Sequence, residues 1–263
     1  MSEQPIIRNE WDGVLELVFN RPGKLNAINV EMMEILTQAV TDLRDDDRHR
    51  VMLIRANGRY FSAGADVSAA QAFDIGNSPA RLRNFARRHL HTGMSSLWDE
   101  MERLEKPIIV AHHATCVGGG LEMSLSCDFR LAAQSAAYSF PELEFAILPL
   151  SGGISRLTRI VGPHWARWLV LANEKVTADQ ALSMGLVHRV IPDETFEEEA
   201  KAFARKLAGH PAEAMAIGKT TIELSALLGT ADARAVERLT YGTLQFSSDY
   251  IEMQAIRRAQ HSK

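Results

Sequence analysis

Strand-like and helix-like segments alternate along the first two thirds of the chain, and this alternation is what most limits the possible folds. Short apolar runs of strand length lie at residues 14–19, 51–54, 108–111, 129–132 and 138–140. Segments whose apolar residues recur at helical spacing lie between several of these runs. This order favours an α/β fold with parallel strands.

Two helices of this part can be placed from their sequence. Asn29 is suited to cap a helix over residues 30–43, whose apolar positions fall on one stripe. A second helix is predicted from about Met94 to Leu104, because Pro107 prevents its continuation. Residues 67–80 lack either pattern and predict a loop.

The last third of the chain is mainly helical. After a short strand at 187–191, three helices and no further strand are predicted from about Thr195 onward. Capping boxes are expected at Thr177 and Thr195, and left-handed helix ends at Gly185 and Gly209. We therefore expect a core at residues 1–192 and a C-terminal helical region at residues 193–263 that packs on the core or on a neighbouring subunit.

Composition narrows the functional classes. The chain has 29 Lys plus Arg against 33 Asp plus Glu, a net charge of −4, which argues against nucleic-acid or anionic-membrane partners. No apolar run is long enough to span a bilayer, and the N-terminal residues do not resemble a secretory signal. With only two cysteines, free thiols in the cytoplasm are expected.

Several familiar site motifs are missing. The sequence has no phosphate-loop, dinucleotide-binding, nucleophile-elbow or H-E-x-x-H motif. His112 and His113 precede Cys116 by a few residues, but neighbouring strand residues point to opposite faces and would not share one ion. No metal site is expected.

Two small-residue segments can expose backbone amides. Gly118-Gly119-Gly120 leads into a short helix, and Ser62-Ala63-Gly64-Ala65 follows a strand. Two such amides directed at one point would form an oxyanion hole. Tight turns and close helix packing explain the same composition equally well.

Two glutamates lie in apolar surroundings near these segments. Glu122 lies on the first turn of the helix after the glycines, and Glu142 follows Phe140-Pro141. Each is either a solvated residue or a buried acid with a raised pKa. Two such acids and an oxyanion hole are the parts needed to add or remove water next to a thioester.

At these residues the sequence resembles the enoyl-CoA hydratase/isomerase, or crotonase, family. The resemblance covers nearly the whole chain and weakens at the C-terminus. Its motifs, in order, are Asn20-Arg21-Pro22, Leu25-Asn26-Ala27, Phe61 to Asp66, Lys106 to Ile109, Gly118 to Glu122, Cys127-Asp128, Phe140-Pro141-Glu142, Pro149, Gly152-Gly153, Arg156-Leu157 and Ala181-x-x-x-Gly185-Leu186-Val187.

The resemblance implies a crotonase-like spiral of ββα turns and C-terminal helices that assemble homotrimers, often paired into hexamers. It implies that the N–H groups of Ala65 and Gly119 form the oxyanion hole. It also implies an acyl-CoA substrate, with Lys24 and Leu25 near its nucleotide portion. The substrate contacts implied are Lys24, Leu25, Ala63, Asp66, Val67 and Gly118.

The acids then discriminate among the family's reactions. With both Glu122 and Glu142 present, the resemblance implies a hydratase, which adds water in the syn sense to a 2-enoyl-CoA without a cofactor beyond the coenzyme A of the substrate. An enoyl-CoA isomerase or an acyl-CoA hydrolase is the alternative, and a non-catalytic binding subunit is a further one. Dienoyl-CoA isomerases carry an aspartate where this chain has Leu150.

Three places depart from the usual hydratase pattern. His112-His113-Ala114 replaces Val-x-Gly, Leu150 stands where glycine is common, and residues 248–253 lack the usual Glu-Gly pair. The water pocket and the tail near the acyl chain are therefore expected to differ, which puts a standard straight-chain substrate in doubt.

Overall fold

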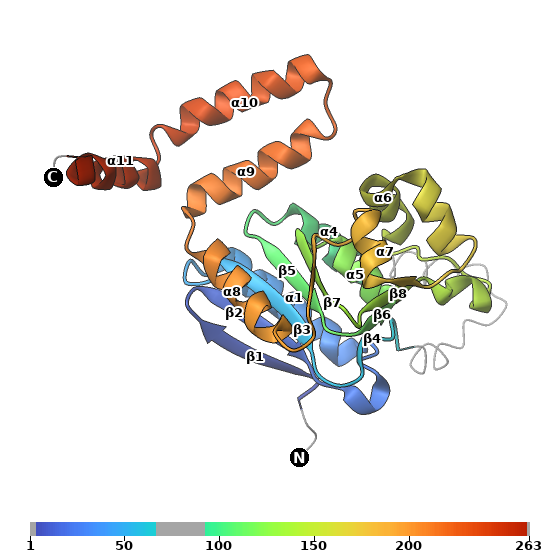
Figure 1. Cartoon of the computed structure of the whole chain (residues 1–263). Helices are drawn as coiled ribbons and strands as arrows, with labels where there is room; N and C mark the ends of the chain where they lie inside the picture. The colour runs from blue at the N-terminus through green and yellow to red at the C-terminus, as the bar shows by residue number, and fades with distance from the viewer. Residues whose placement is uncertain (1–3, 67–92, 262–263) are drawn as a thin grey trace, which may run out of the picture.

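Two sheets form the centre of the molecule (Figure 1). The computed structural model describes residues 4–66 and 93–261. Within them, the larger sheet has the order β1 (Ile6–Trp11), β2 (Val14–Phe19), β3 (Val51–Ala56), β5 (Ile108–His112), β7 (Phe129–Ala133) and β10 (Arg189–Ile191). The smaller sheet has the order β4 (Tyr60–Ser62), β6 (Thr115–Val117), β8 (Ala137–Ser139) and β9 (Val176–Thr177).

The chain winds through both sheets as a spiral. Each turn adds one strand to the larger sheet and the next strand to the smaller one, as β3 then β4, β5 then β6, and β7 then β8. These strands pair in parallel within each sheet. The expected α/β fold with a ββα spiral is therefore confirmed.

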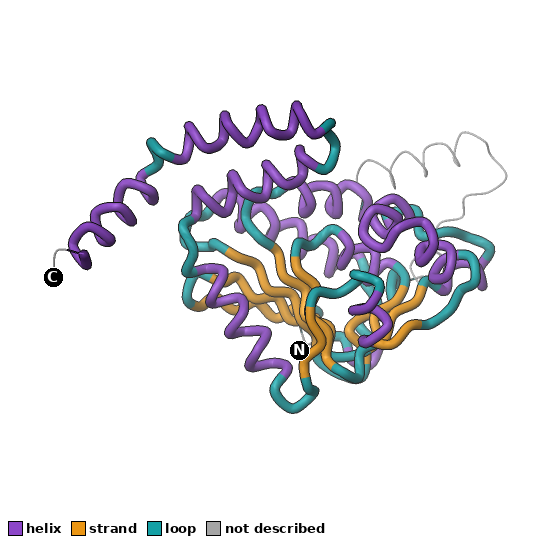
Figure 2. Tube along the Cα trace, turned by 45° about the horizontal axis from the view of Figure 1, so that its top comes forward, coloured by secondary structure: helices purple, strands orange, loops and turns teal. Residues whose placement is uncertain are grey.

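Helices cover the larger sheet on both faces (Figures 1 and 2). In β3, Met52 and Ile54 face the main core, while Val51 and Leu53 face a second apolar cluster, as expected for a strand buried on both sides. The helices on the main-core side include α1 (Val30–Asp45), α4 (Met94–Arg103) and α5 (Gly119–Leu125). Helices α6 (Gly153–Val170) and α7 (Ala178–Ser183) also pack on the main core. Helix α8 (Phe196–Ala208) lies on the other side.

The local signals for helix ends were right in part. Asn29 caps α1 by accepting the N–H of Met32, and Thr177 forms the predicted capping box with Gln180. Thr195 does not cap α8; its hydroxyl donates to Glu199 instead. Gly185 has a positive φ of 80°, but Gly209 has φ −78°, so the left-handed end predicted there was wrong.

The C-terminal region contains one helix more than predicted. In the described residues α8 is followed by α9 (Ala212–Ser225), α10 (Thr230–Leu244) and α11 (Ser248–His261), because Gly229 and the 245–247 turn divide the segment. Helix α8 packs on the sheet, whereas α10 and α11 extend away from it (Figures 1 and 2). The boundary near residue 192 stays a prediction.

Four strands were missed: β1, β4, β6 and β9. β1 pairs antiparallel with β2 through Asp12 and Gly13, whose φ values of 47° and 78° suit a tight hairpin turn. Its burial alternates, and the Asp-Gly pair was the available signal. β4 and β6 have only three residues each and β9 only two, too few to show a period. No helix in the described parts of the chain is long and apolar enough to cross a membrane.

Candidate active site

The N–H of Ala65 points away from Ile28, the residue with which its loop pairs. Ile28 donates to the carbonyl of Gly64 and accepts from the N–H of Asp66, which is a parallel bridge centred on Ala65. In such a bridge the central residue directs its own N–H away from the partner strand. Among the described residues, no acceptor is recorded for this amide.

The N–H of Gly119 is available for a different reason. Gly119 is the first residue of α5, where amides have no acceptor within the helix. A Cβ placed on Gly119 would lie 3.2 Å from the nitrogen of Ala65, so the two loops touch. The two amides predicted to form an oxyanion hole are thus neighbours at a helix N-terminus, which favours negative charge.

Buried polar side chains hold the Ala65 loop in place. Asn26, fully buried, donates to the carbonyls of Asn57 and Tyr60 at 2.7 and 2.9 Å. Ser62 donates to the carbonyl of Asn26 and accepts the N–H of Gly64 at 3.1 Å. In the sequence these residues stand out only as motif members, because hydrogen bonds between residues up to 36 positions apart leave no periodic pattern.

The other predicted contacts gather around the same loop. The N–H of Ala63 donates to the carbonyl of Leu25 at 2.9 Å, which brings exposed Lys24 alongside. Asp66 accepts from the guanidinium of Arg21 at 3.1 Å, so its carboxylate has a partner within the protein. Val67 lies outside the described residues. The roles of these residues in substrate binding stay predictions.

Glu122 is a buried acid. Glu122 is 5% exposed, and its Oε1 accepts the N–H of Ser151 at 2.7 Å. A Cβ on Gly153 would lie 2.8 Å from the same oxygen, so the α6 N-terminus closes over it. Burial raises the pKa of Glu122 to about 7, the bond from Ser151 opposes this, and the charge of Glu142 adds to it.

Glu142 approaches the glycine segment from the 3-10 helix Pro141–Phe145, which follows β8. A Cβ on Gly118 would lie 3.0 Å from its Oε1, and Gly118 has φ 53°. Its Oε2 is buried with no hydrogen-bond partner among the described groups. Burial raises its pKa above the usual range. A buried unpaired carboxylate oxygen is costly, and such atoms concentrate at functional sites.

The site therefore combines two neighbouring amides with two acids close to the glycine segment. Of the two alternatives for the glutamates, burial and raised pKa favour acids suited to proton transfer near neutral pH. His112 and His113 take different partners, Ser124 Oγ and the carbonyl of Gly58. Within residues 4–66 and 93–261 no group of three metal-ligating side chains occurs.

The raised pKa of Glu122 predicts a pH dependence of stability. Between its ordinary value of 4.5 and about 7, the native state keeps a proton that the unfolded chain has released. The free energy of unfolding therefore falls as pH rises through this window. In Glu122→Gln this side chain does not titrate, so the variant does not lose this stability. The unfolding free energy of the variant minus that of wild type should therefore increase by up to about 3 kcal/mol between pH about 4 and about 8. Denaturant unfolding of both proteins measures it; a difference independent of pH would contradict it.

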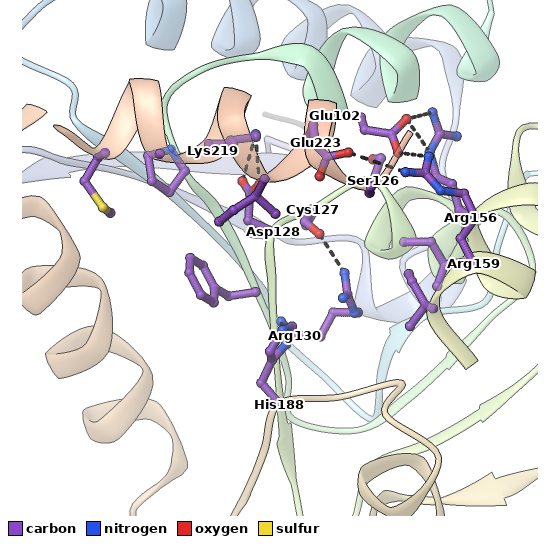
Figure 3. A pocket seen from close by; sticks show the side chains of 18 of the residues that line it. Glu102, Ser126, Cys127, Asp128, Arg130, Arg156, Arg159, His188, Lys219 and Glu223 are labelled. Carbon is purple, nitrogen blue, oxygen red and sulfur yellow. Dashed lines mark hydrogen bonds and ion pairs between the residues drawn. The ribbon is translucent and has the colours of Figure 1, made fainter. Parts of the chain in front are cut away.

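A separate cavity of about 550 Å³ lies at the opposite end of α5 (Figure 3). Lys219 of α9 contacts Asp128 at 2.9 Å there, and Arg130 donates to the carbonyl of Cys127 at 2.6 Å. The arginine satisfies carbonyls at the end of α5, and the ion pair fastens α9. None of the predicted site residues lines this cavity, so size alone does not identify the active site.

Known proteins place the chain in one family. The family model described as enoyl-CoA hydratase/isomerase matches residues 9–254. The chain is 31% identical to a 2,3-dehydroadipyl-CoA hydratase of Escherichia coli over 95% of this chain and 92% of that protein. It is 30% identical to a short-chain-enoyl-CoA hydratase of Clostridium acetobutylicum, over 92% and 90%.

Comparison with solved structures points to the same family. An enoyl-CoA hydratase from Bacillus anthracis superposes with a TM-score of 0.86 at 27% identity, covering 97% of each chain. This fold with this site defines proteins of the crotonase class. The chain belongs to the enoyl-CoA hydratase/isomerase family, as the motifs indicated.

Proposed function

We propose that the protein is an enoyl-CoA hydratase, a lyase that adds water to a 2-enoyl-CoA or removes it from the corresponding 3-hydroxyacyl-CoA. The observation that carries this proposal is a buried acid, Glu122, and a half-buried acid, Glu142, beside two backbone amides that have no acceptor among the described residues. The similarity to proteins named as hydratases supports it.

The proposed reaction uses each part once. The Ala65 and Gly119 amides hold the thioester oxygen as it gains negative charge. One glutamate takes a proton from a water molecule as the oxygen of that water bonds to C3. The other glutamate delivers a proton to C2, and the carbon–carbon double bond becomes single. Syn addition requires both acids on one face of the substrate. These groups supply the chemistry, so the proposal includes no cofactor beyond the coenzyme A of the substrate.

An isomerase needs only to move one proton, and one of the two acids would then have no role in the reaction. An acyl-CoA hydrolase also uses paired acids, and its product distinguishes it. The test is to incubate the protein with crotonyl-CoA and longer 2-enoyl-CoA thioesters and follow the absorbance of the conjugated thioester. Loss of absorbance with a 3-hydroxyacyl-CoA product supports the proposal; free coenzyme A or a shifted double bond would overturn it.

The proposal includes a homotrimer or hexamer built by the C-terminal helices. No residue of α9 or α10 is buried in the single chain. The sequence pattern predicts Tyr241, Leu244 and Phe246 on the last helix. In the structure Tyr241 and Leu244 lie on α10 instead, and Phe246 lies beyond it and is 85% exposed. Apolar surface of this kind favours association. Light scattering should give three or six times the chain mass; a monomer stable to dilution would contradict it.

A cytoplasmic location also belongs to the proposal. Cys116 and Cys127 are both free and buried. Burial raises the pKa of both thiols well above the usual range for cysteine. Unpaired cysteines are typical of reducing compartments.

A further inference from the structure

A chain of three polar side chains crosses the apolar core behind the glycine segment. His112, at the end of β5, is fully buried. Its Nδ1 lies 3.2 Å from the hydroxyl of Tyr138, and its Nε2 lies 2.8 Å from Oγ of Ser124. Ser124 in turn donates to the carbonyl of Gly120 at 2.8 Å. The proposed reaction uses none of these side chains.

The bond from Ser124 to the carbonyl of Gly120 sets the direction of the other protons in this hydrogen-bond chain. Ser124 has one hydroxyl proton, and the carbonyl of Gly120 can only accept it. Oγ of Ser124 must then accept from Nε2–H of His112, which leaves Nδ1 free to accept from the hydroxyl of Tyr138. The result is one complete chain, Tyr138 to His112 to Ser124 to Gly120. Burial lowers the pKa of His112 to about 3, so the ring stays neutral.

The three elements that His112 touches are the ones that carry the site. Tyr138 belongs to β8, which leads to Glu142, and Ser124 and Gly120 belong to α5, which carries Gly119 and Glu122. The ring of Phe61 in β4, four residues before Ala65, lies edge-on at 4.6 Å between centroids. The imidazole therefore contacts β4, β8 and α5 from one point.

We propose that His112 is a positioning residue, which fixes the two amides and the two glutamates relative to one another through Tyr138, Ser124 and Phe61. Directional hydrogen bonds define the rotation of α5 more closely than apolar contacts do. A displacement of reacting groups by about 1 Å can cost about 10²-fold in rate. This inference rests on the proposed hydratase function for its kinetic test but not for its structural test.

The kinetic test compares two buried serines on the same helix end. Ser124→Ala removes the link between His112 and Gly120 and should lower kcat about tenfold, with KM for crotonyl-CoA changed less than about twofold. Ser126→Ala is the matched control: its hydroxyl is also buried and donates to a carbonyl of α5, that of Met123 at 2.6 Å, but does not contact His112. We expect it to lower the unfolding temperature without lowering kcat. Full kcat in Ser124→Ala, or equal losses in both variants, would overturn the proposal.

Tyr138→Phe provides a second variant that keeps the ring packing and removes only the hydroxyl. It should also lower kcat with little change in KM. The structural test is nitrogen NMR of histidine-labelled wild-type protein, with His112 assigned by its loss in His112→Val. We expect a neutral Nε2–H tautomer at pH about 6. An Nδ1–H tautomer would refute the proposed chain of hydrogen bonds from Tyr138 to Gly120. Wild type without hydratase activity would refute the proposed function, whereas this test would still report on His112.

Discussion

Replacing either Glu122 or Glu142 by glutamine is expected to lower kcat for crotonyl-CoA by about 10²-fold or more, which is the contribution of a positioned acid or base. The amide keeps the size of the carboxyl group but cannot exchange a proton with water or with C2. In Glu122→Gln the carbonyl oxygen can still accept the N–H of Ser151. Both variants should therefore fold, and steady-state kinetics with circular dichroism measures the effect.

Glu144→Gln is the matched control for this prediction. Glu144 lies two residues after Glu142 in the same 3-10 helix, but it is exposed and accepts from Asn173 at 3.0 Å. Its substitution should leave kcat unchanged. If Glu122→Gln or Glu142→Gln kept the wild-type rate, the mechanism with two glutamates would be wrong for this chain. Both raised pKa values would then reflect burial alone.

The sequence could predict these two acids because their chemistry is local. Glu122 stands one turn into a helix that the glycines begin, and Glu142 lies three residues after the end of β8. Their spatial relation was not local: it depends on β6 and β8 pairing in parallel, and β6 has only three residues. The resemblance to a family supplied the spiral, which alternation of strands and helices alone could not distinguish from other α/β folds.

The residues that hold the site were harder to predict. Ser151 binds Glu122 through its backbone, which any residue could do, so its side chain carries no information. His112 looked like one of two strand-end histidines, and only the contacts to Tyr138 and Ser124 reveal its chain of hydrogen bonds. Tertiary partners of this kind are separated by 12 to 26 positions and follow no period.

Gly119→Val is expected to lower kcat by about 10²–10³-fold, or about 3–4 kcal/mol, for every acyl-CoA that the enzyme accepts. The variant keeps its N–H, but the new Cβ would lie 3.2 Å from the nitrogen of Ala65 and 3.7 Å from its Cβ. The side chain would therefore stand where the thioester oxygen must approach both amides. The φ of Gly119 is not positive, so near-normal stability is expected, with Met94 at 3.6 Å as the nearest side-chain contact outside Ala65.

Gly209→Val makes the same chemical change at a distant site. Its Cβ would meet nothing closer than 3.5 Å, and its φ of −78° suits any residue, so kcat should not change. A crystal structure of the wild type with a bound acyl-CoA completes the test. If the thioester oxygen lay more than about 3.5 Å from both the Ala65 and Gly119 nitrogens, it would be beyond hydrogen-bond range. The amides would then not stabilise the charge that every proposed reaction of this site develops, and the loss of rate in Gly119→Val would need a steric cause instead.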